Sequence, residues 1–399
     1  MSAIATRLVT QTRTPTRVAQ VGIVIGALAF FFTLPPVEAR APWVPALVGI
    51  VALALGIFAV TRGAGRMGWY AVSVGVIGIA LGVLATRSST GNLESVVTWG
   101  SLIGSTLVWA TPLCYAAVGG MVNERSGVVN IGLEGMMLAG AFFACLGADK
   151  FGSWEMGVVT AAVAGAGFAL LHAIWAIHLR ADQIISGFAI NFLALGVTGY
   201  FFIQVYGANG TPGNLPRIPD VNIPGLKAHT FLGDSIGHLN AMIWASFLLL
   251  IVAQIVLFHT PVGLRLRAVG EHPRAADTVG ISVYLTRYLA VMTSGILAAL
   301  GGAYLSIGFV GSFGENMTAG RGFIALAAVI FGNWRPFGAY AAAILFGAST
   351  ALSFRLATYS DSASVLFQAL PYVLTLIAVA GVIGRPVPPA AVGRPYVKQ

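Results

Sequence analysis

The stretch NERSGVVNIGLEGMM occupies residues 123–137 and lies between two long apolar runs. It brings Glu124, Arg125, Asn130 and Glu134 together with three glycines and a serine, in a chain in which only 9% of residues are charged. Residues four apart share one face of a helix, as Asn130 and Glu134 would. Glycines let a helix break or let two backbones approach closely. We therefore expect a broken helix with one polar face.

The composition around this stretch is that of a membrane protein. The 399 residues are 57% hydrophobic, and the mean hydropathy is +0.86. A soluble domain is about 45–50% apolar and about 25% charged, so both measures point to a bilayer. The net charge of +9 does not indicate nucleic-acid binding, because the basic residues are spread along the chain. Cys114 and Cys145 lie in apolar runs and are expected to be packed, without a disulfide framework or a metal site.

Twelve apolar runs are candidates for helices that cross a bilayer core about 30 Å thick. They lie at 18–34, 44–61, 67–85, 97–122, 128–147, 156–178, 184–206, 239–258, 284–307, 322–333, 338–354 and 363–383. The run at 322–333 is short and is expected to be re-entrant or broken, which is tolerated only where protein or a water-filled cavity surrounds it. The predicted fold class is an all-α polytopic membrane protein with about twelve transmembrane segments.

The distribution of Lys and Arg predicts that both termini are cytoplasmic. With the N-terminus inside and the spans alternating, most of the 22 Lys and Arg residues fall on the inner side. The first run follows a basic start, and Val37-Glu38-Ala39 resembles a cleavage site, so a removable signal peptide is one alternative. We expect a retained helix, because the run is longer than a typical signal core and more spans follow.

Three sequence motifs of enzyme chemistry are absent from the chain. There is no GxxxxGK[ST], HExxH or CxxC motif, and none of Lys150, Lys227 and Lys398 follows a glycine. The chain is therefore predicted to be a transport subunit and not an enzyme. Its intramembrane carboxylates reduce essentially to Glu134, which leaves an ion-coupled secondary transporter as the weaker alternative.

Two loops stand out. Residues 207–238 are rich in Gly and Pro and are expected outside; long loops of this kind are commonly functional, and the alternative is a lid or a simple connector. Residues 259–283 are expected inside, and within them Pro273–Thr278 is predicted to form a short cytoplasmic helix, because Pro is favoured in a first helical turn. The alternative is a basic loop that only fixes the topology.

Three stretches resemble the permease subunits of bacterial ABC importers for nucleosides and simple sugars, in the wider group of ribose and branched-chain amino acid permeases. They are TPLCYAAVGGMVNERSGVVNIGLEGMMLAGAF at 111–142, GLRLRAVGEHPRAADTVGI at 263–281 and GRGFIALAAVIFGNWRPFGA at 320–339. The first is typical of the nucleoside branch. The second resembles the cytoplasmic coupling segment, although His272 stands where Asn is expected. The resemblance begins near residue 95 and covers about three quarters of the chain.

The resemblance implies a permease domain of about ten helices at 91–385, preceded by extra transmembrane helices at 1–90 and followed by a cytoplasmic tail at 386–399. It implies nucleoside import through the bacterial inner membrane by alternating access. A separate ATPase subunit would bind ATP, so the chain itself needs no cofactor. A second, homologous permease subunit in a heterodimer, an extracytoplasmic lipoprotein that binds the solute, and membrane lipid are the other implied partners. A permease for a simple sugar such as ribose is the alternative within this group.

The candidate site residues form two groups, and no metal ligand is among them. The solute pathway is predicted at Trp109, Asn130, Glu134, Gln183, Phe188 and Asn191. Amide groups there could bond a ribose hydroxyl or a base edge, and aromatic rings could stack on a base. The alternative is that these polar groups only brace neighbouring helices. Contact with the ATPase is implied for Gly270, Glu271, Pro273, Ala275, Ala276 and Gly280.

Overall fold

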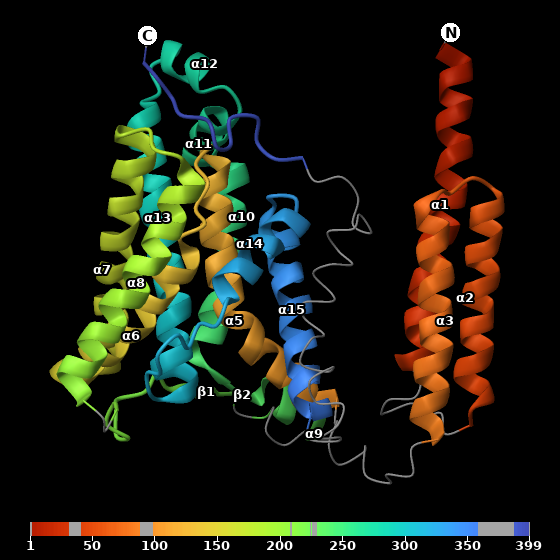
Figure 1. Cartoon of the computed structure of the whole chain (residues 1–399), viewed down its shortest axis with the longest axis horizontal. Coiled ribbons are helices and arrows are strands. Elements are labelled where there is room, and N and C mark those ends of the chain that lie inside the picture. Colours follow the sequence, from red (N-terminus) through yellow and green to blue (C-terminus); the bar gives the residue numbers. More distant parts are fainter. Residues whose placement is uncertain are drawn as a thin grey trace. The chain divides into compact units, whose positions relative to one another are not determined.

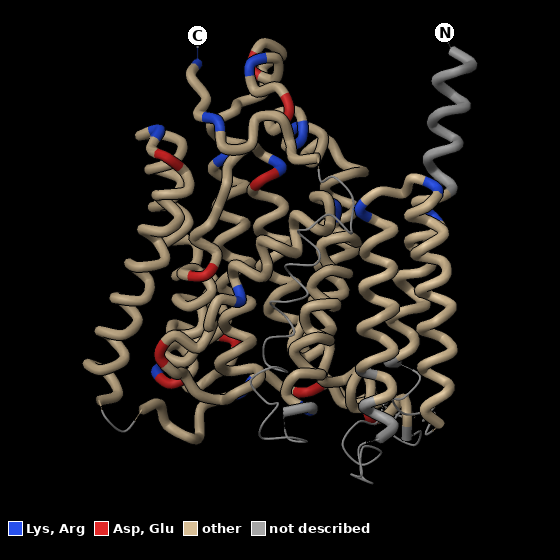
Figure 2. Tube along the Cα trace, turned by 45° about the vertical axis from the view of Figure 1, so that its right-hand side comes forward, with Lys and Arg blue, Asp and Glu red and all other residues tan. Residues whose placement is uncertain are grey.

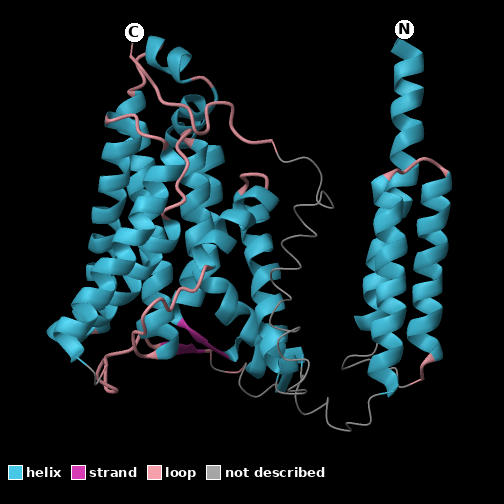
Figure 3. Cartoon of the chain, in the orientation of Figure 1, coloured by secondary structure: helices cyan, strands magenta, loops and turns pink. Residues whose placement is uncertain are grey.

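The computed structural model describes residues 2–31, 41–87, 99–207, 210–223, 225, 230–357 and 387–398. This part of the chain is almost entirely helical, with two short strands (Figures 1 and 3). It divides into two compact units, Met1–Ser101 and Leu102–Gln399. The all-α prediction is confirmed, whereas the predicted boundary between residues 90 and 91 lies outside the described residues.

Unit 1 is a bundle of three helices, α1 (Ser2–Phe31), α2 (Trp43–Thr61) and α3 (Arg66–Arg87). The helices approach closely because small residues line their contacts. A Cβ atom added to Gly26 would lie 3.0 Å from the backbone nitrogen of Gly75. Helices in a bilayer associate through such close packing rather than through a hydrophobic drive. The predicted runs at the N-terminus are therefore confirmed as helices, and they form a unit of their own.

Unit 2 holds the remaining elements. Its long helices are α5 (Trp99–Arg125), α6 (Leu133–Phe151), α7 (Trp154–Ala173), α8 (Gln183–Tyr206), α10 (Ala241–His259), α13 (Val283–Ala303) and α15 (Pro336–Ala357). Its shorter elements are β1 (Asp220–Asn222), α9 (Thr230–Leu232), β2 (His238–Asn240), α11 (Pro261–Glu271), α12 (Pro273–Thr278) and α14 (Arg321–Phe331). Turns of π-helix extend α7 to His178 and α13 to Val310.

Eleven of the twelve predicted runs are helices, and the twelfth, 363–383, lies outside the described residues. Among the described helices, seven are long and apolar enough to cross a membrane, and three shorter apolar segments accompany them. The chain is thus a multi-pass membrane protein. Helix α14 has 11 residues, or about 16 Å of length, which is about half of the apolar layer. The short helix predicted at 322–333 is confirmed, and its re-entrant or broken course through the membrane stays a prediction.

One predicted helix start is wrong. The run at 128–147 becomes helical only at Leu133, and residues 126–132 form a turn. Gly127 ends α5 with a φ of +91°, a conformation that favours glycine. The side chain of Asn123 donates to the carbonyl oxygen of Val128 at 2.9 Å, and that of Ser126 donates to the carbonyl of Asn123 at 2.7 Å. These local bonds replace helical ones, so the apolar pattern continues while the helix does not.

The centre of unit 2 is built on α6 and α13, which pack backbone against backbone. A Cβ atom at Gly140 of α6 would fall on the backbone of Ala299, and one at Gly302 of α13 would fall on the carbonyl oxygen of Met137. Nearly the whole circumference of α6 is buried. A helix that is apolar on all sides belongs in the middle of a bundle, and the elements around α6 hold the polar groups described below.

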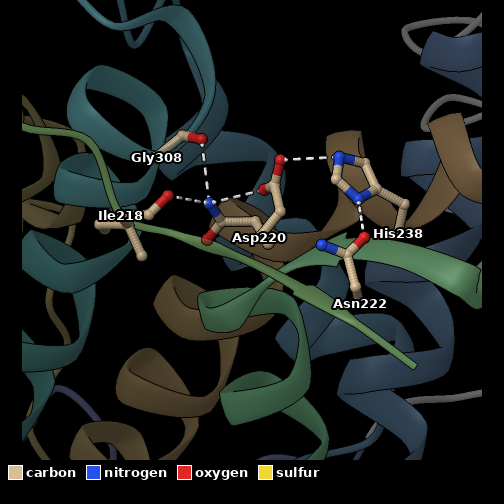
Figure 4. A network of polar contacts seen from close by, with 6 residues as sticks. Ile218, Asp220, Asn222, His238 and Gly308 are labelled. Atoms are coloured by element: carbon tan, nitrogen blue, oxygen red, sulfur yellow. Dashed lines mark hydrogen bonds and ion pairs between the residues drawn. The ribbon is translucent and has the colours of Figure 1, made fainter. Parts of the chain in front are cut away.

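The two strands lie at the end of unit 2 opposite to α12 (Figure 1). They form an antiparallel pair, which is fixed to the last turns of α13 by the side chain of Asn240. Its amide donates to the carbonyl oxygens of Ile218 at 2.9 Å and Gly308 at 3.2 Å (Figure 4). On the exposed side, His238 pairs with Asp220 at 3.1 Å. Part of the predicted outer loop is thus a fixed hairpin, and its role as lid or connector stays a prediction.

The charged residues of unit 2 are unevenly distributed. Lys and Arg gather at the end that carries α11, α12 and residues 387–398, whereas the middle of the helices holds few charges (Figure 2). Such a bias is the usual mark of the cytoplasmic side of a membrane protein.

The close packing of α6 on α13 predicts the effect of enlarging one glycine. Gly140→Val should prevent the two helices from meeting, because overpacking of this kind costs about 1–3 kcal/mol or more. The fraction of monodisperse protein after solubilisation and its melting temperature should both fall. Gly167→Val in α7 is the matched control, because a Cβ atom there has open space. Equal behaviour of the two variants would contradict this packing.

Candidate functional site

The turn at 126–132 is held by side chains from two other helices. The backbone N–H of Val129 donates to Gln183 Oε1 at 2.7 Å, and the carbonyl oxygen of Val129 lies 3.0 Å from His172 Nε2. The other nitrogen of His172 lies 2.8 Å from the hydroxyl of Ser186. Non-helical backbone inside a bilayer is stable only when its polar groups find partners in the protein. Gln183 therefore braces the turn.

Asn191 of α8 braces the start of α6 in the same way. Its Oδ1 accepts from the backbone N–H of Gly135 at 2.8 Å, and its Nδ2 donates to the carbonyl oxygen of Ile131 at 3.1 Å. A Cβ atom at Gly135 would lie 2.8 Å from the Cα of Asn191, so glycine allows this approach. Both ends of the amide are used within the protein, and a contact with solute stays a prediction.

Asn130 lies inside the bundle, with none of its surface exposed. Its Nδ2 is 3.2 Å from the hydroxyl of Ser294 in α13 and 3.4 Å from the sulfur of Met136. Its Oδ1 has no hydrogen-bond partner among the described residues. Asn130 thus ties the turn to α13.

Glu134 joins the first turn of α6 to the first turn of α14. Its Oε1 accepts from the backbone N–H of Gly320 at 2.8 Å, and its Oε2 accepts from that of Gly322 at 2.6 Å. A carboxylate is stabilised at a helix N-terminus, where free N–H groups carry partial positive charge. A Cβ atom at Gly322 would lie 2.5 Å from the Cα of Glu134. The stretches 111–142 and 320–339, which both resemble the permease family, therefore meet here.

The other end of α14 is held at the end of α5. The indole N–H of Trp334 donates to Glu124 Oε2, and Arg125 Nε donates to the carbonyl oxygen of Trp334 at 2.9 Å. Asn333 and Trp334 have φ angles of +51° and +52°. Residues other than glycine pay about 1–3 kcal/mol for such conformations, which persist only where their surroundings impose them. Glu124 and Arg125 provide that constraint for Trp334.

The predicted coupling segment contains two helices. Pro273–Thr278 is α12, as predicted, whereas α11 was not predicted. A Cβ atom at Gly270 would fall on the carbonyl oxygen of Arg125, so α11 lies directly against the end of α5. Ala276 is buried, and Glu271, Ala275 and Gly280 are exposed. The stretch 263–281, which resembles the coupling segment of the permease family, thus contacts the stretch 111–142.

The two aromatic candidates both contact the first turn of α14. Trp109 stacks on Phe354 with ring centroids 4.8 Å apart, and the guanidinium of Arg321 lies 5.3 Å from the centroid of Trp109. The ring of Phe188 lies 6.3 Å from that of Phe323 and is partly exposed. The six pathway candidates therefore converge on two places, the turn before α6 and the first turn of α14. Whether the rings meet a solute stays a prediction.

Several residues of this region were not among the predicted site residues. They are His172, Arg287, Ser294, Gly320, Gly322 and Trp334. For Arg287 a signal was available, because it is a lone charge in an apolar run, and such residues mark functional positions by default. The glycines carry no comparable signal in a chain with 50 of them. In the described part of the chain, no group of three His, Cys, Asp or Glu residues could hold a metal ion.

Interrupted helices that meet inside an all-helical bundle are typical of membrane transport proteins. The chain belongs to the family described as the permease component of the branched-chain amino acid transport system, whose model matches residues 102–379. That match begins one residue after the end of unit 1. The chain is therefore a transport component and not an enzyme, and the resemblance noted in its sequence is confirmed. No solved structure matches it.

Individual relatives are similar over most of their length. The chain is 44% identical over 314 residues to the guanosine ABC transporter permease protein NupQ of Bacillus subtilis, which covers 74% of this chain and 96% of that protein. It is 39% identical to the nucleoside ABC transporter permease protein NupC of Lactococcus lactis, with the same coverage of both. A putative glucose ABC transporter permease of Haloferax volcanii is 34% identical over 64% of this chain and 77% of its own. A second permease from each of the first two organisms matches at 25% and 26% identity.

The bond between Glu134 and α14 predicts a loss of transport in Glu134→Gln. The amide offers one acceptor where the carboxylate offers two, and it removes the charge at the helix N-terminus. Hydrogen bonds to charged groups contribute about 1.5–3 kcal/mol, so uptake into vesicles should fall about ten-fold or more. Glu155→Gln at the exposed start of α7 is the control. Uptake that is unchanged in both variants would show that the bond does not matter for transport.

Proposed function

We propose that this chain is the transmembrane permease subunit of a bacterial ABC importer for nucleosides. The observation that carries the proposal is the 44% and 39% identity to two nucleoside permeases over 96% of their lengths. The similarity to ABC transporter permeases argues against the alternative of an ion-coupled secondary carrier. The solute itself is inferred from the relatives, since no solute contact is described in this chain.

The proposed orientation puts the end with α11, α12 and residues 387–398 in the cytoplasm. The gathering of Lys and Arg at that end supports it (Figure 2). On this basis the protein lies in the inner membrane with residues 387–398 in the cytoplasm, and the Lys and Arg counts along the sequence support a cytoplasmic N-terminus as well. The hairpin of β1 and β2 then faces the outside, where an extracytoplasmic lipoprotein would deliver the solute.

The proposed mechanism is alternating access driven by ATP hydrolysis on a separate subunit. The exposed face of α12 would dock the ATPase, which binds the ATP. Movement there would reach the end of α5 through the contact of Gly270 with Arg125. From α5 the movement would pass to α14. Arg125 and Glu124 hold Trp334, just after the end of α14, and Glu134 holds Gly320, just before its start. Helix α14 is the element that these contacts can move.

A second permease subunit would complete the pathway. The two organisms with the similar nucleoside permeases each have a further, more distant permease that also matches this chain. Two related but unequal permeases are what a heterodimer requires. We therefore infer that the partner is a homologous chain and not a second copy of this one.

A sugar importer is the second candidate function. The identity of 34% to a putative glucose permease favours it, but that match covers less of both chains than the nucleoside permeases do. Both kinds of solute present hydroxyl groups, and only a nucleoside presents a base for aromatic contact.

Uptake measurements distinguish the two solutes. Deletion of the gene should abolish most uptake of labelled guanosine, adenosine and uridine, and complementation should restore it. Uptake of glucose and ribose should remain unchanged in the same strains, because these sugars lack the base of a nucleoside. Loss of sugar uptake with normal nucleoside uptake would contradict the nucleoside assignment and support the second candidate.

Docking of the ATPase predicts a local effect of added bulk on α12. Ala275→Trp should prevent co-purification of the ATPase and abolish transport, because Ala275 lies on the exposed face of the helix. Val221→Trp on the exposed strand β1 is the matched control, at the opposite end of unit 2. Membrane insertion should be normal in both. Co-purification of the ATPase with the Ala275 variant would place the docking surface elsewhere.

A further inference from the structure

The C-terminal segment 387–398 lies across the end of unit 2 that carries α11 and α12 (Figure 1). Its backbone bonds to two elements at once. The N–H of Ala391 donates to the carbonyl oxygen of Gly270 at 2.9 Å, and the N–H of Gly393 donates to that of Gly127 at 3.2 Å. Gly270 belongs to α11, and Gly127 belongs to the turn that leads to α6. The segment therefore links the coupling helices to the turn.

Arg287 fixes the segment to the same turn. It lies near the start of α13, and only 1% of it is exposed. Its Nε donates to the carbonyl oxygen of Ser126 at 3.3 Å, and its Nη1 donates to that of Arg394 at 3.1 Å. A Cβ atom at Gly127 would lie 2.9 Å from its Nη2, so glycine is needed beside it. A buried guanidinium is costly unless its donors are used. Nε and Nη1 are used to join the turn to the segment, whereas Nη2 has no hydrogen-bond partner among the described residues.

Tyr396 fixes the far end of the segment to α12 and α13. It is buried in a cluster with Val269, Ala276 and Val283. Its ring packs edge-on against that of Tyr284, with centroids 5.6 Å apart. Ala276 belongs to α12, so movement of this helix acts directly on the segment.

The near end of the segment reaches two further groups. Glu271 Oε2 accepts from the N–H of Ala390 at 3.1 Å, and Asn333 Oδ1 accepts from that of Val387 at 3.0 Å. Asn333 lies in the turn between α14 and α15. Terminal residues are usually poorly ordered unless they are tied down. This segment is tied to α11, α12, α13 and two turns.

We propose that residues 387–398 form a strap that transmits movement of α11 and α12 to the turn at 126–132. Arg287 is the positioning residue, because it holds the strap and the turn together. The inference rests on the proposed function, in which α12 docks the ATPase. Without the strap, hydrolysis continues, but less of the movement reaches α6 and α14. The transporter then uses more ATP for each solute molecule.

The test compares coupling in the reconstituted complex of both permeases, the ATPase and the binding protein. The variants are a chain ending at residue 386, Tyr396→Ala, Arg287→Gln and Arg287→Lys. The ATP hydrolysed per nucleoside should rise about five-fold or more in the first three, since coupling between sites is typically about 5–150-fold. In Arg287→Lys the ATP hydrolysed per nucleoside should rise less, because the lysine ammonium can still donate to one of the two carbonyl oxygens. The half-saturating nucleoside concentration should stay unchanged, as should all values for the exposed-residue control Val397→Ala.

A second measurement does not depend on the solute. Hydrogen exchange of the permease in lipid nanodiscs should become faster in peptides covering 126–132 for Tyr396→Ala and Arg287→Lys, but not for Val397→Ala. A wild-type complex that takes up no nucleoside would refute the proposed solute, and the exchange result would still decide on the strap. Wild-type coupling and wild-type exchange in assembled Tyr396→Ala and Arg287→Lys proteins would overturn the inference, even if the truncated chain fails to assemble.

Discussion

The rest of the permease unit depends on the carboxylate of Glu134 and its two bonds to the start of α14. A charged group inside a bilayer needs a partner, and so do the free N–H groups of a helix that begins there. The carboxylate and the N–H groups satisfy each other, because Glu134 accepts from the backbone of Gly320 at 2.8 Å and from that of Gly322 at 2.6 Å. Because the partners are backbone groups of glycines, the contact fixes the positions of two helix starts. Helix α6 begins beside it, and α14 can be short because its first turn is already bonded.

The same rule explains the polar groups around this contact. With no water in the apolar layer, every interruption of a helix must be bonded from inside the protein. Gln183, His172 and Asn191 bond the backbone of the turn before α6. They lie on α7 and α8, so these helices are held to α6 by the interruption itself. Elsewhere the helices meet through small residues, as α6 and α13 do at Gly140 and Ala299, and through single polar contacts such as that of Ser246 with Tyr340 at 2.9 Å.

Much of the fold could be predicted from the sequence, because hydropathy alone reveals a helix that faces lipid. Eleven helices, the short α14 among them, follow from the length of the apolar runs, and the start of α12 follows from Pro273. The start of α6 could not be predicted, since Val128 and Ile131 continue the apolar pattern through a turn that Gln183 and Asn191 stabilise from a distance. The candidate polar residues were identified, but their partners were not. The contact of Glu134 with residue 320 spans 186 positions, and no periodicity encodes a bond to a backbone group so far away.

The turn between α14 and α15 has a consequence for how the protein moves. Asn333 and Trp334 both adopt left-handed conformations, which a tryptophan does not prefer in isolation. The conformation of Trp334 is held by Glu124 and Arg125 at the end of α5. If α5 moved away from Trp334, this constraint would be lost and the turn could take up a conformation of lower energy. Because packed elements tend to change between discrete arrangements and not gradually, we expect the turn after α14 to switch between two conformations, with the position of α5 deciding which one it adopts.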